Sequence, residues 1–293
     1  MNTPAEAILA TLMDRPLVAD PFPLYHELRA LDPVHREPNG IWYLTRFDDC
    51  ERVFRSPTFG HGGTHLHGAS GRRAELLSLM FSFDDPPEHT RKRAAVGAPF
   101  SAASTATYRP RLRELIDQLL DPITPGDSVD LDDLLSARLP VLVTCELLGI
   151  PASDRERCVH WVELMTSSNQ PVMTGEHAER ILADADDAAA AVTDYFGWLI
   201  GRPADDLRGD IVPPLADLLR RGACSRDEVI ATLVLLMAAG FETTRYTITG
   251  GLTVMAAQPD TWTRARAAVL STGDLSSDAV EELLRHQGPI HGA

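Results

Sequence analysis

The chain has 293 residues, 44% of them hydrophobic, and alanine and leucine dominate over β-branched residues. This length and composition favour a mostly helical protein with a sizeable buried core. The net charge of −15, from 27 basic and 42 acidic side chains, argues against a nucleic-acid-binding protein, which needs a basic face, and gives no reason to expect adsorption to an anionic membrane.

The sequence shows neither a targeting signal nor a membrane-spanning pattern. The start of the chain has no basic region followed by an apolar run, and the longest apolar stretch, 229–240, is shorter than the roughly 18 residues of a spanning helix. The cysteines are scattered without C-x-x-C spacing, which indicates reduced thiols: Cys50, Cys145, Cys158 and Cys224. We expect a cytoplasmic protein and take a monomer as the default.

The first 56 residues predict a short helix and a small β-sheet. Four prolines in the opening segment indicate an irregular stretch over the surface before a helix at 23–31. Strands are expected at 34–36 and 41–45, because a Pro-Asn-Gly turn sequence lies between them. A small helix is expected at 47–54.

Residues 57–84 are predicted to form a long, glycine-rich loop that carries His61, His65 and His67. Long loops in compact domains are often functional. Three imidazoles this close can bind a transition metal. Their spacing is irregular, however, and we favour a flexible surface loop over a metal site.

Helices dominate from residue 85 onward. Asp85 is expected to cap a helix with Pro86 at its first position and Glu88 at N3. The S-x-x-E capping pattern recurs twice, at Ser153 with Glu156 and at Ser225 with Glu228. The predicted helices are 87–99, 103–120, 132–148, 153–167, 176–200, 225–256 and 278–286, with a proline-rich connection around 201–214. The helix at 225–256, about 48 Å long, is expected to pass through the centre of the domain.

One run inside the long predicted helix suggests a site: Ala239-Gly240-Phe241-Glu242-Thr243-Thr244. Glycine costs about 1 kcal/mol relative to alanine in a helix interior, threonine competes for backbone carbonyls, and a carboxylate beside an apolar stretch must be paired or reach water. The small residues would let a flat ligand approach the backbone, Thr243 would offer a hydroxyl, and Glu242 could supply protons from solvent. A kinked core helix with a surface glutamate explains the run equally well.

Two shorter patterns place charges on predicted helices. His89 and Arg93 are four residues apart and share one face, as in a clamp for a carboxylate or phosphate, although a solvated basic surface has the same pattern. Glu282 and Arg285 are three residues apart and can pair within a helix or join a buried network. By itself the second pattern is common on helix surfaces.

Together, in this order and spacing, these motifs resemble those of the cytochrome P450 superfamily, specifically its soluble bacterial branch. The run from Ala239 to Thr244 is similar to the oxygen-activation motif of the family's I helix, and Glu282 to Arg285 is similar to the E-x-x-R of its K helix. Further similar segments are 42–49 (WYLTRFDD), 85–93 followed by Phe100-Ser101 (the C-helix signature), and 146–151 (ELLGIP). The resemblance covers essentially the whole chain.

The resemblance implies a mainly α fold with a small β-sheet, the cytochrome P450 fold, here ending after the K helix. The expected parts of a single incomplete domain over 1–293 are the N-terminal helix and sheet at 1–56, the access loop between helices B and C at 57–84, helices C to H at 85–224, the I helix at 225–256 and the K helix at 278–286. With the connection at 167–175, the access loop would shape substrate entry.

The resemblance also implies residue roles. His89 and Arg93 would bind the propionates of haem (iron protoporphyrin IX). Ala239 and Gly240 would lie over the haem face, and Glu242 and Thr243 would form the acid–alcohol pair that delivers protons during oxygen activation. Glu282 and Arg285 would anchor the core on the haem side.

The complete enzyme would be a monooxygenase that inserts one oxygen atom from O2 into an organic substrate. Its electrons would come from a ferredoxin or flavoprotein, which Arg91 and Lys92 could help to dock. No nucleic-acid or membrane partner is expected.

The sequence departs from the family at the axial ligand. The family's cysteine loop, of the type Phe-x-x-Gly-x-x-x-Cys-x-Gly, supplies the thiolate that binds the iron, and this chain does not contain it. None of the four cysteines is expected to replace it, so no metal ligand is predicted here and haem binding by this chain is doubtful. We expect a chain truncated after the K helix.

One alternative is a haemless P450-like auxiliary protein that activates a partner enzyme such as a glycosyltransferase. Such a helper needs neither His89 and Arg93 nor Glu242 and Thr243, and the chain has all four. Their presence favours an enzyme ancestry, although a recently truncated copy would keep them too. A generic helical domain with chance matches is disfavoured by three motifs in the family's order.

Overall fold

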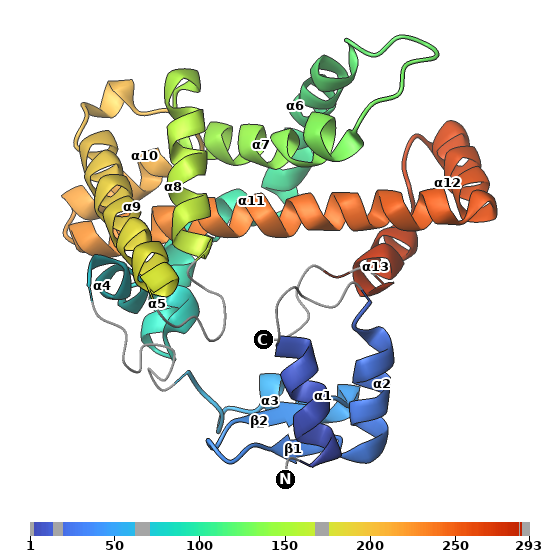
Figure 1. Ribbon diagram of the computed structural model, residues 1–293. Helices are drawn as coiled ribbons and strands as arrows, with labels where there is room; N and C mark the ends of the chain where they lie inside the picture. Colours follow the sequence, from blue (N-terminus) through green and yellow to red (C-terminus); the bar gives the residue numbers. More distant parts are fainter. Residues whose placement is uncertain (1–2, 14–19, 62–70, 168–175, 287, 289–293) are drawn as a thin grey trace. The chain divides into compact units, whose positions relative to one another are not determined.

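The computed structural model describes residues 3–13, 20–61, 71–167, 176–286 and 288. The chain divides into two compact units, residues 1–62 and 63–293 (Figure 1). Helices dominate both units, and the described part of the chain contains one small sheet. A mainly α fold with a small sheet is therefore confirmed. The single incomplete domain over 1–293 stays a prediction.

The N-terminal unit packs two helices and a hairpin around a small core. Its elements are α1 (Pro4–Met13), α2 (Phe22–Leu31), β1 (Val34–Arg36), β2 (Trp42–Leu44) and α3 (Phe47–Arg55). The two strands pair antiparallel, with Val34 opposite Leu44, across a turn in which Gly40 has a φ of 93°. The core consists of Ala5, Ile8, Leu9, Leu12 and Leu28.

The expected irregular start is wrong, because α1 forms within it. The Thr3 hydroxyl accepts a hydrogen bond from the Glu6 N–H at 3.2 Å, and the Glu6 carboxylate accepts one from the Thr3 N–H at 2.7 Å. This capping box satisfies two backbone donors at the start of the helix. Pro4 lies in the first turn, where its missing N–H costs nothing. Burial of Leu9 then holds the helix against the rest of the unit.

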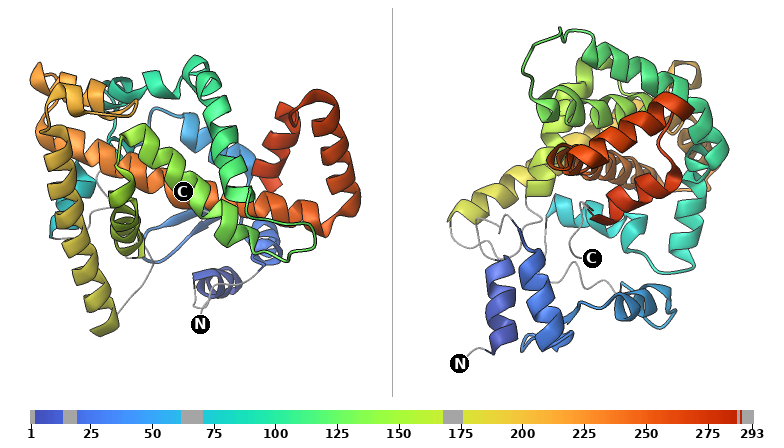
Figure 2. Two further views of the ribbon diagram at one scale, coloured as in Figure 1. Left: turned by 90° about the horizontal axis from the view of Figure 1, so that it is seen from above. Right: turned by 90° about the vertical axis from the view of Figure 1, so that its right-hand side faces the viewer.

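The C-terminal unit is built around one long helix, α11 (Arg226–Ala257). Helices gather about its N-terminal half, and two more follow at its C-terminal end (Figures 1 and 2). Ten α-helices are described here: α4 (Arg72–Ser78), α5 (Glu88–Val96), α6 (Ala102–Leu120), α7 (Arg138–Leu148), α8 (Arg155–Ser167), α9 (Glu176–Ile200), α10 (Val212–Arg220), α11, α12 (Pro259–Thr272) and α13 (Ser277–His286). The predicted central position of the long helix is confirmed.

The apolar first half of α11 explains that position. Ser225 and Glu228 form the predicted capping box, with bonds of 3.2 and 2.8 Å. Val229, Leu233 and Met237 behind it are almost fully buried. By length and composition α11 is also the one described helix that could cross a membrane. Core helices of globular proteins have the same property.

In the C-terminal unit three helices form where none was predicted: α4, α10 and α12. α4 lies inside the predicted loop 57–84. Near the start of α4, the Arg73 N–H donates a 2.9 Å hydrogen bond to the Asp186 carboxylate of α9. α10 begins with two prolines inside the expected connection, because proline is tolerated in a first helical turn. α12 begins with Pro259 for the same reason.

Several predicted helix starts are shifted. α5 begins at Glu88 after Pro87, without a side-chain cap, so the predicted cap at Asp85 is wrong. The predicted helix 132–148 is a π-helix, η4 (Asp132–Ser136), followed by α7. At 153–167 the helix begins only at Arg155, after the 3₁₀ turn η5 (Ala152–Asp154).

Candidate functional site

The middle of α11 has a face that is at least partly exposed to solvent, here called the open face, which carries Ala239, Thr243 and Tyr246. Ala239 is exposed, and Thr243, one turn later, is half-buried. The Thr243 Oγ1 donates a hydrogen bond to the Ala239 carbonyl at 2.5 Å, and Tyr246 in the next turn is 53% exposed. A hydroxyl that donates to a carbonyl one turn back bends a helix locally. Small side chains and one oriented hydroxyl therefore line this face.

The side of Gly240 on which a side chain would stand faces α7. A Cβ atom at this position would lie 2.5 Å from the Thr144 Oγ1 and 3.2 Å from its Cγ2. Gly240 thus permits close approach between α11 and α7, and the side-chain position that it leaves empty is directed at α7. That both small residues lie over one ligand face stays a prediction, in which Ala239 offers the exposed side chain.

Glu242 makes a contact that the sequence did not reveal. Its carboxylate accepts a hydrogen bond from the Thr166 Oγ1 of α8 at 3.2 Å, and the side chain is half-buried. Thr166 also bonds to the Glu163 carbonyl within its own helix at 3.3 Å. Because 76 residues separate the two partners, no local pattern could have predicted the pair.

His89 and Arg93 lie one turn apart on α5, as the helical spacing predicts. The His89 ring is half-buried, with its centroid 6.1 Å from that of Phe81. Arg93 is exposed and has no ion pair within the described part of the chain. Both groups are available to an acidic ligand, and their propionate-binding role stays a prediction.

Arg91 and Lys92, which lie between His89 and Arg93, form ion pairs within the protein. These ion pairs change the role predicted for them in docking an electron donor. Arg91 donates to the Glu88 carboxylate at 2.7 and 2.9 Å and also to Glu228 at the start of α11. Lys92 is 8% exposed, and its ammonium lies 2.7 Å from an Asp84 carboxylate oxygen and 3.1 Å from the Leu79 carbonyl oxygen. Buried and paired, Lys92 is not a surface docking residue. Arg91 ties α5 to α11.

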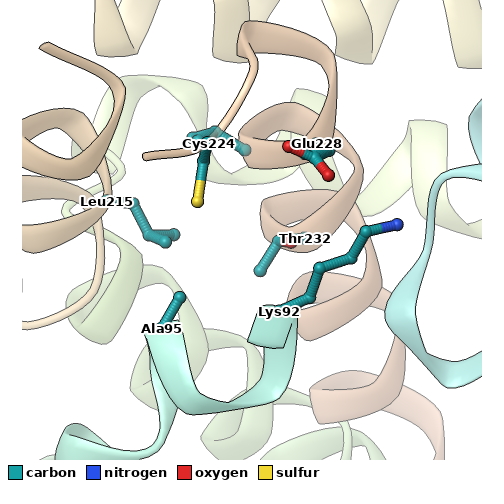
Figure 3. A pocket seen from close by; sticks show the side chains of 7 residues that line it. Lys92, Ala95, Leu215, Cys224, Glu228 and Thr232 are labelled. Carbon is teal, nitrogen blue, oxygen red and sulfur yellow. The ribbon is translucent and has the colours of Figure 1, made fainter. Parts of the chain in front are cut away.

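None of the four cysteines is exposed: Cys145 and Cys158 are buried, and Cys50 and Cys224 are half-buried. Burial raises the pKa of Cys145 to about 11 and that of Cys158 to about 12, and both side chains are fully buried. In the N-terminal unit the Cys50 thiol donates to the Leu44 carbonyl at 3.5 Å. The Cys224 sulfur points into a void of about 10 Å³ that Leu215 and Thr232 also line (Figure 3). A void of this size is close to the smallest that can hold one water molecule.

Glu282 and Arg285 form the predicted pair on α13, with distances of 2.7 and 2.8 Å. Their side chains are 60% and 69% exposed, so within the described residues the pair lies at the surface. Hydrogen bonding to the arginine lowers the pKa of Glu282. An anchoring role in the core stays a prediction.

The histidine cluster is only partly described. His61 lies at the end of a described segment, whereas His65 and His67 lie outside the described residues, as does most of the connection at 167–175. Among the described residues no group of three or more His, Cys, Asp or Glu side chains could hold a metal ion.

Comparisons with known proteins agree with the motifs. No family model matches the chain. The chain is 32% identical over 297 residues to cytochrome P450 BJ-3 of Bradyrhizobium diazoefficiens, covering 96% of this chain and 67% of that protein. It is 31% identical over 287 residues to vitamin D(3) 25-hydroxylase of Pseudonocardia autotrophica, with 94% and 66% covered. For cytochrome P450 monooxygenase PikC of Streptomyces venezuelae the identity is 30% over 285 residues, with 94% and 64% covered.

Solved structures show the same relationship. The crystal structure of CalO2 has a TM-score of 0.80 at 28% identity, covering 94% of this chain and 68% of that one. The Mycobacterium smegmatis structure named CYP164A2 has a TM-score of 0.79 at 29% identity, with 95% and 70% covered. The chain spans about two thirds of the length of the proteins that it matches. It belongs to the cytochrome P450 superfamily of haem proteins, among its bacterial members.

Proposed function

We propose that this protein serves a haem-dependent monooxygenase reaction on a small organic substrate, with the open face of α11 as the reaction site. The observation that carries the proposal is the hydrogen bond from Thr243 to the Ala239 carbonyl, which orients one hydroxyl on a face of small side chains. Two similar proteins are named as hydroxylases, vitamin D(3) 25-hydroxylase and mycinamicin IV hydroxylase/epoxidase.

The residues present fit two parts of a haem site. Exposed Ala239 adds only a methyl group to its turn of α11, so a flat macrocycle can approach the backbone there. Arg93 and His89 on α5 would bind the propionates through charge-assisted hydrogen bonds. When bound, haem supplies the iron centre at which O2 is activated.

Proton handling would fall to Thr243 and Glu242. Because the Thr243 proton is donated to Ala239, the lone pairs of its oxygen stay free to accept a hydrogen bond from the open side. Glu242 is half-buried and held by Thr166. A carboxylate with partial access to water can exchange protons with solvent and pass them along the helix. Electrons would come from a ferredoxin or flavoprotein.

The third part of a P450 site is an axial thiolate, and none of the four cysteines fits that role. Cys145 and Cys158 are protonated and enclosed at neutral pH, and the void beside Cys224 is far too small for a macrocycle. The Cys50 thiol already donates a hydrogen bond to the Leu44 carbonyl. We infer that none of the four binds the iron. A second candidate function, a haemless auxiliary protein that activates a partner such as a glycosyltransferase, requires no iron ligand from these cysteines.

Titration of the purified chain with haem, followed by absorbance, tests these proposals. Because none of the four cysteines binds the iron, we expect weak binding, which weakens about a further tenfold in His89→Ala and Arg93→Ala, since each loses one charge-assisted contact. Arg113→Ala is the matched control, because Arg113 is an exposed arginine on α6 whose partner is Asp274. Binding that ignores both α5 variants would contradict the site.

Reduction in carbon monoxide tests the ligand inference separately. We expect no band of the thiolate-ligated type, and a clear band of that type would contradict the inference. If the chain binds no haem and raises the activity of a partner glycosyltransferase, the auxiliary function replaces the monooxygenase.

A further inference from the structure

We propose that Asp132 is a positioning residue for the site on α11, acting through Arg245 and Thr249 on the segment that carries Thr243. The inference rests on the proposed role of Thr243. Asp132 belongs to η4, and its two partners lie 113 and 117 residues away in the sequence. None of the three residues belongs to the motifs that identified the site.

The contacts form a three-point clamp. The Arg245 Nε donates to both Asp132 carboxylate oxygens, at 3.3 and 3.2 Å, and its Nη2 donates to one of them. The Thr249 hydroxyl donates to the other oxygen at 2.5 Å. Arginine–carboxylate pairs of this kind combine charge with fixed geometry. Since Arg245 and Thr249 lie one turn apart, one carboxylate holds a full turn of α11.

The carboxylate itself is held in place. The Asp132 N–H donates to the Asp130 carboxylate at 2.9 Å, and the Asp132 carbonyl accepts the Ala137 N–H at 2.8 Å in the π-helical pattern. The Asp132 and Arg245 side chains are 29% and 37% exposed. A partly buried and oriented partner of this kind is less screened than a surface ion pair.

Thr243 lies between two contacts to the same segment of chain. Before it, Gly240 packs against Thr144 of α7. After it, Arg245 and Thr249 bind Asp132 at the start of η4, which leads directly into α7. Because both contacts are made to the segment of η4 and α7, they fix the position of the intervening turn along the axis of α11 and its rotation about that axis. The Asp132 clamp therefore sets the direction in which the Thr243 hydroxyl points.

This part of α11 needs such a constraint. Thr243, Thr247 and Thr253 each donate to a carbonyl one turn back, at 2.5, 2.8 and 2.8 Å, and adjacent Gly250 and Gly251 add flexibility. Both features weaken a helix relative to alanine. Without the clamp, the segment would rely on its backbone hydrogen bonds and on limited packing.

The test measures the hydrogen bond from Thr243 to the Ala239 carbonyl separately from the global stability of the protein. The Ala239 carbonyl ¹³C chemical shift reports its hydrogen bond to Thr243, and Thr243→Val provides the value without that bond. In Asp132→Asn we expect the shift to move toward the Thr243→Val value and amide exchange over 239–249 to rise about tenfold, while exchange over 229–237 stays unchanged. Asp132→Glu, which keeps the charge, should restore much of both signals.

Asp274→Asn is the matched control, because it removes an aspartate that binds two exposed arginines of α6. If Asp132→Asn lowers global stability but leaves the Ala239 shift unchanged, the pair only stabilises the fold and the inference is wrong. Neither readout needs haem. Failure of the haem titration would therefore remove the proposed function while leaving the clamp measurable.

Discussion

The two halves of α11 are held by different interactions, although they form one continuous helix. In the first half Val229, Leu233 and Met237 are buried among neighbouring helices. In the second half only Phe241 and Gly251 are buried between residues 239 and 257, and polar contacts such as Asp132–Arg245 hold the helix. Apolar burial is strong but non-directional, whereas hydrogen bonds fix rotation. The first half anchors the helix, and the second can present a hydroxyl.

The largest expected effect is on the anchored half. Leu233→Ala should lower the free energy of unfolding by about 2–5 kcal/mol, because it opens a cavity in a fully buried position. Thr253→Ala in the exposed half should change it by less than about 0.5 kcal/mol. Urea denaturation of both variants checks the contrast. Equal losses would show that the two halves contribute alike.

The four thiols differ in their access to solvent. Cys145 and Cys158 belong to the core that encloses the first half of α11, and burial raises the pKa of both well above neutrality. At pH 8 they should be alkylated at least about 100-fold more slowly than Cys50 and Cys224, which are half-buried. Mass spectrometry after timed labelling measures this ratio. Similar rates for all four would mean that the core opens readily.

A substitution at the junction of the halves should have an intermediate effect. In Gly240→Ala the new methyl would meet the Thr144 Oγ1 at 2.5 Å, and overpacking of this kind costs about 1–3 kcal/mol. Adding Thr144→Ala should recover much of the loss, because it removes the two nearest atoms. If the two substitutions are simply additive in denaturation experiments, the contact does not determine the cost.

The smallest expected effect is a pH response confined to the second half. Hydrogen bonds from Arg245, then from Thr249, hold the pKa of Asp132 below its usual value. The clamp therefore contributes fully above the unfolded pKa of about 4 and is lost as the pH falls through the lower folded pKa. Amide exchange over 243–249, corrected for its intrinsic pH dependence, should rise in acid relative to 229–237. Asp132→Asn should abolish the difference.

Sequence patterns determined the features that depend on neighbours along the chain. The capping box at Ser225 and Glu228, the long apolar helix behind it, the Gly40 turn and the Glu282–Arg285 pair all follow from residues within one or two turns of each other. The family followed from the order of short motifs, which survives without knowledge of contacts. Even α1 had a readable local signal in Thr3 and Glu6.

The face that each site residue occupies depends on how the helices pack against one another. Gly240 turns toward Thr144, Lys92 is buried on Asp84, and Glu242 meets Thr166. Helical spacing places residues on a common stripe, but it does not state what packs against that stripe. The clamp between Asp132 and Arg245 joins segments 113 residues apart. Contacts of that kind exist only after the helices have packed, so no local pattern in the sequence encodes them.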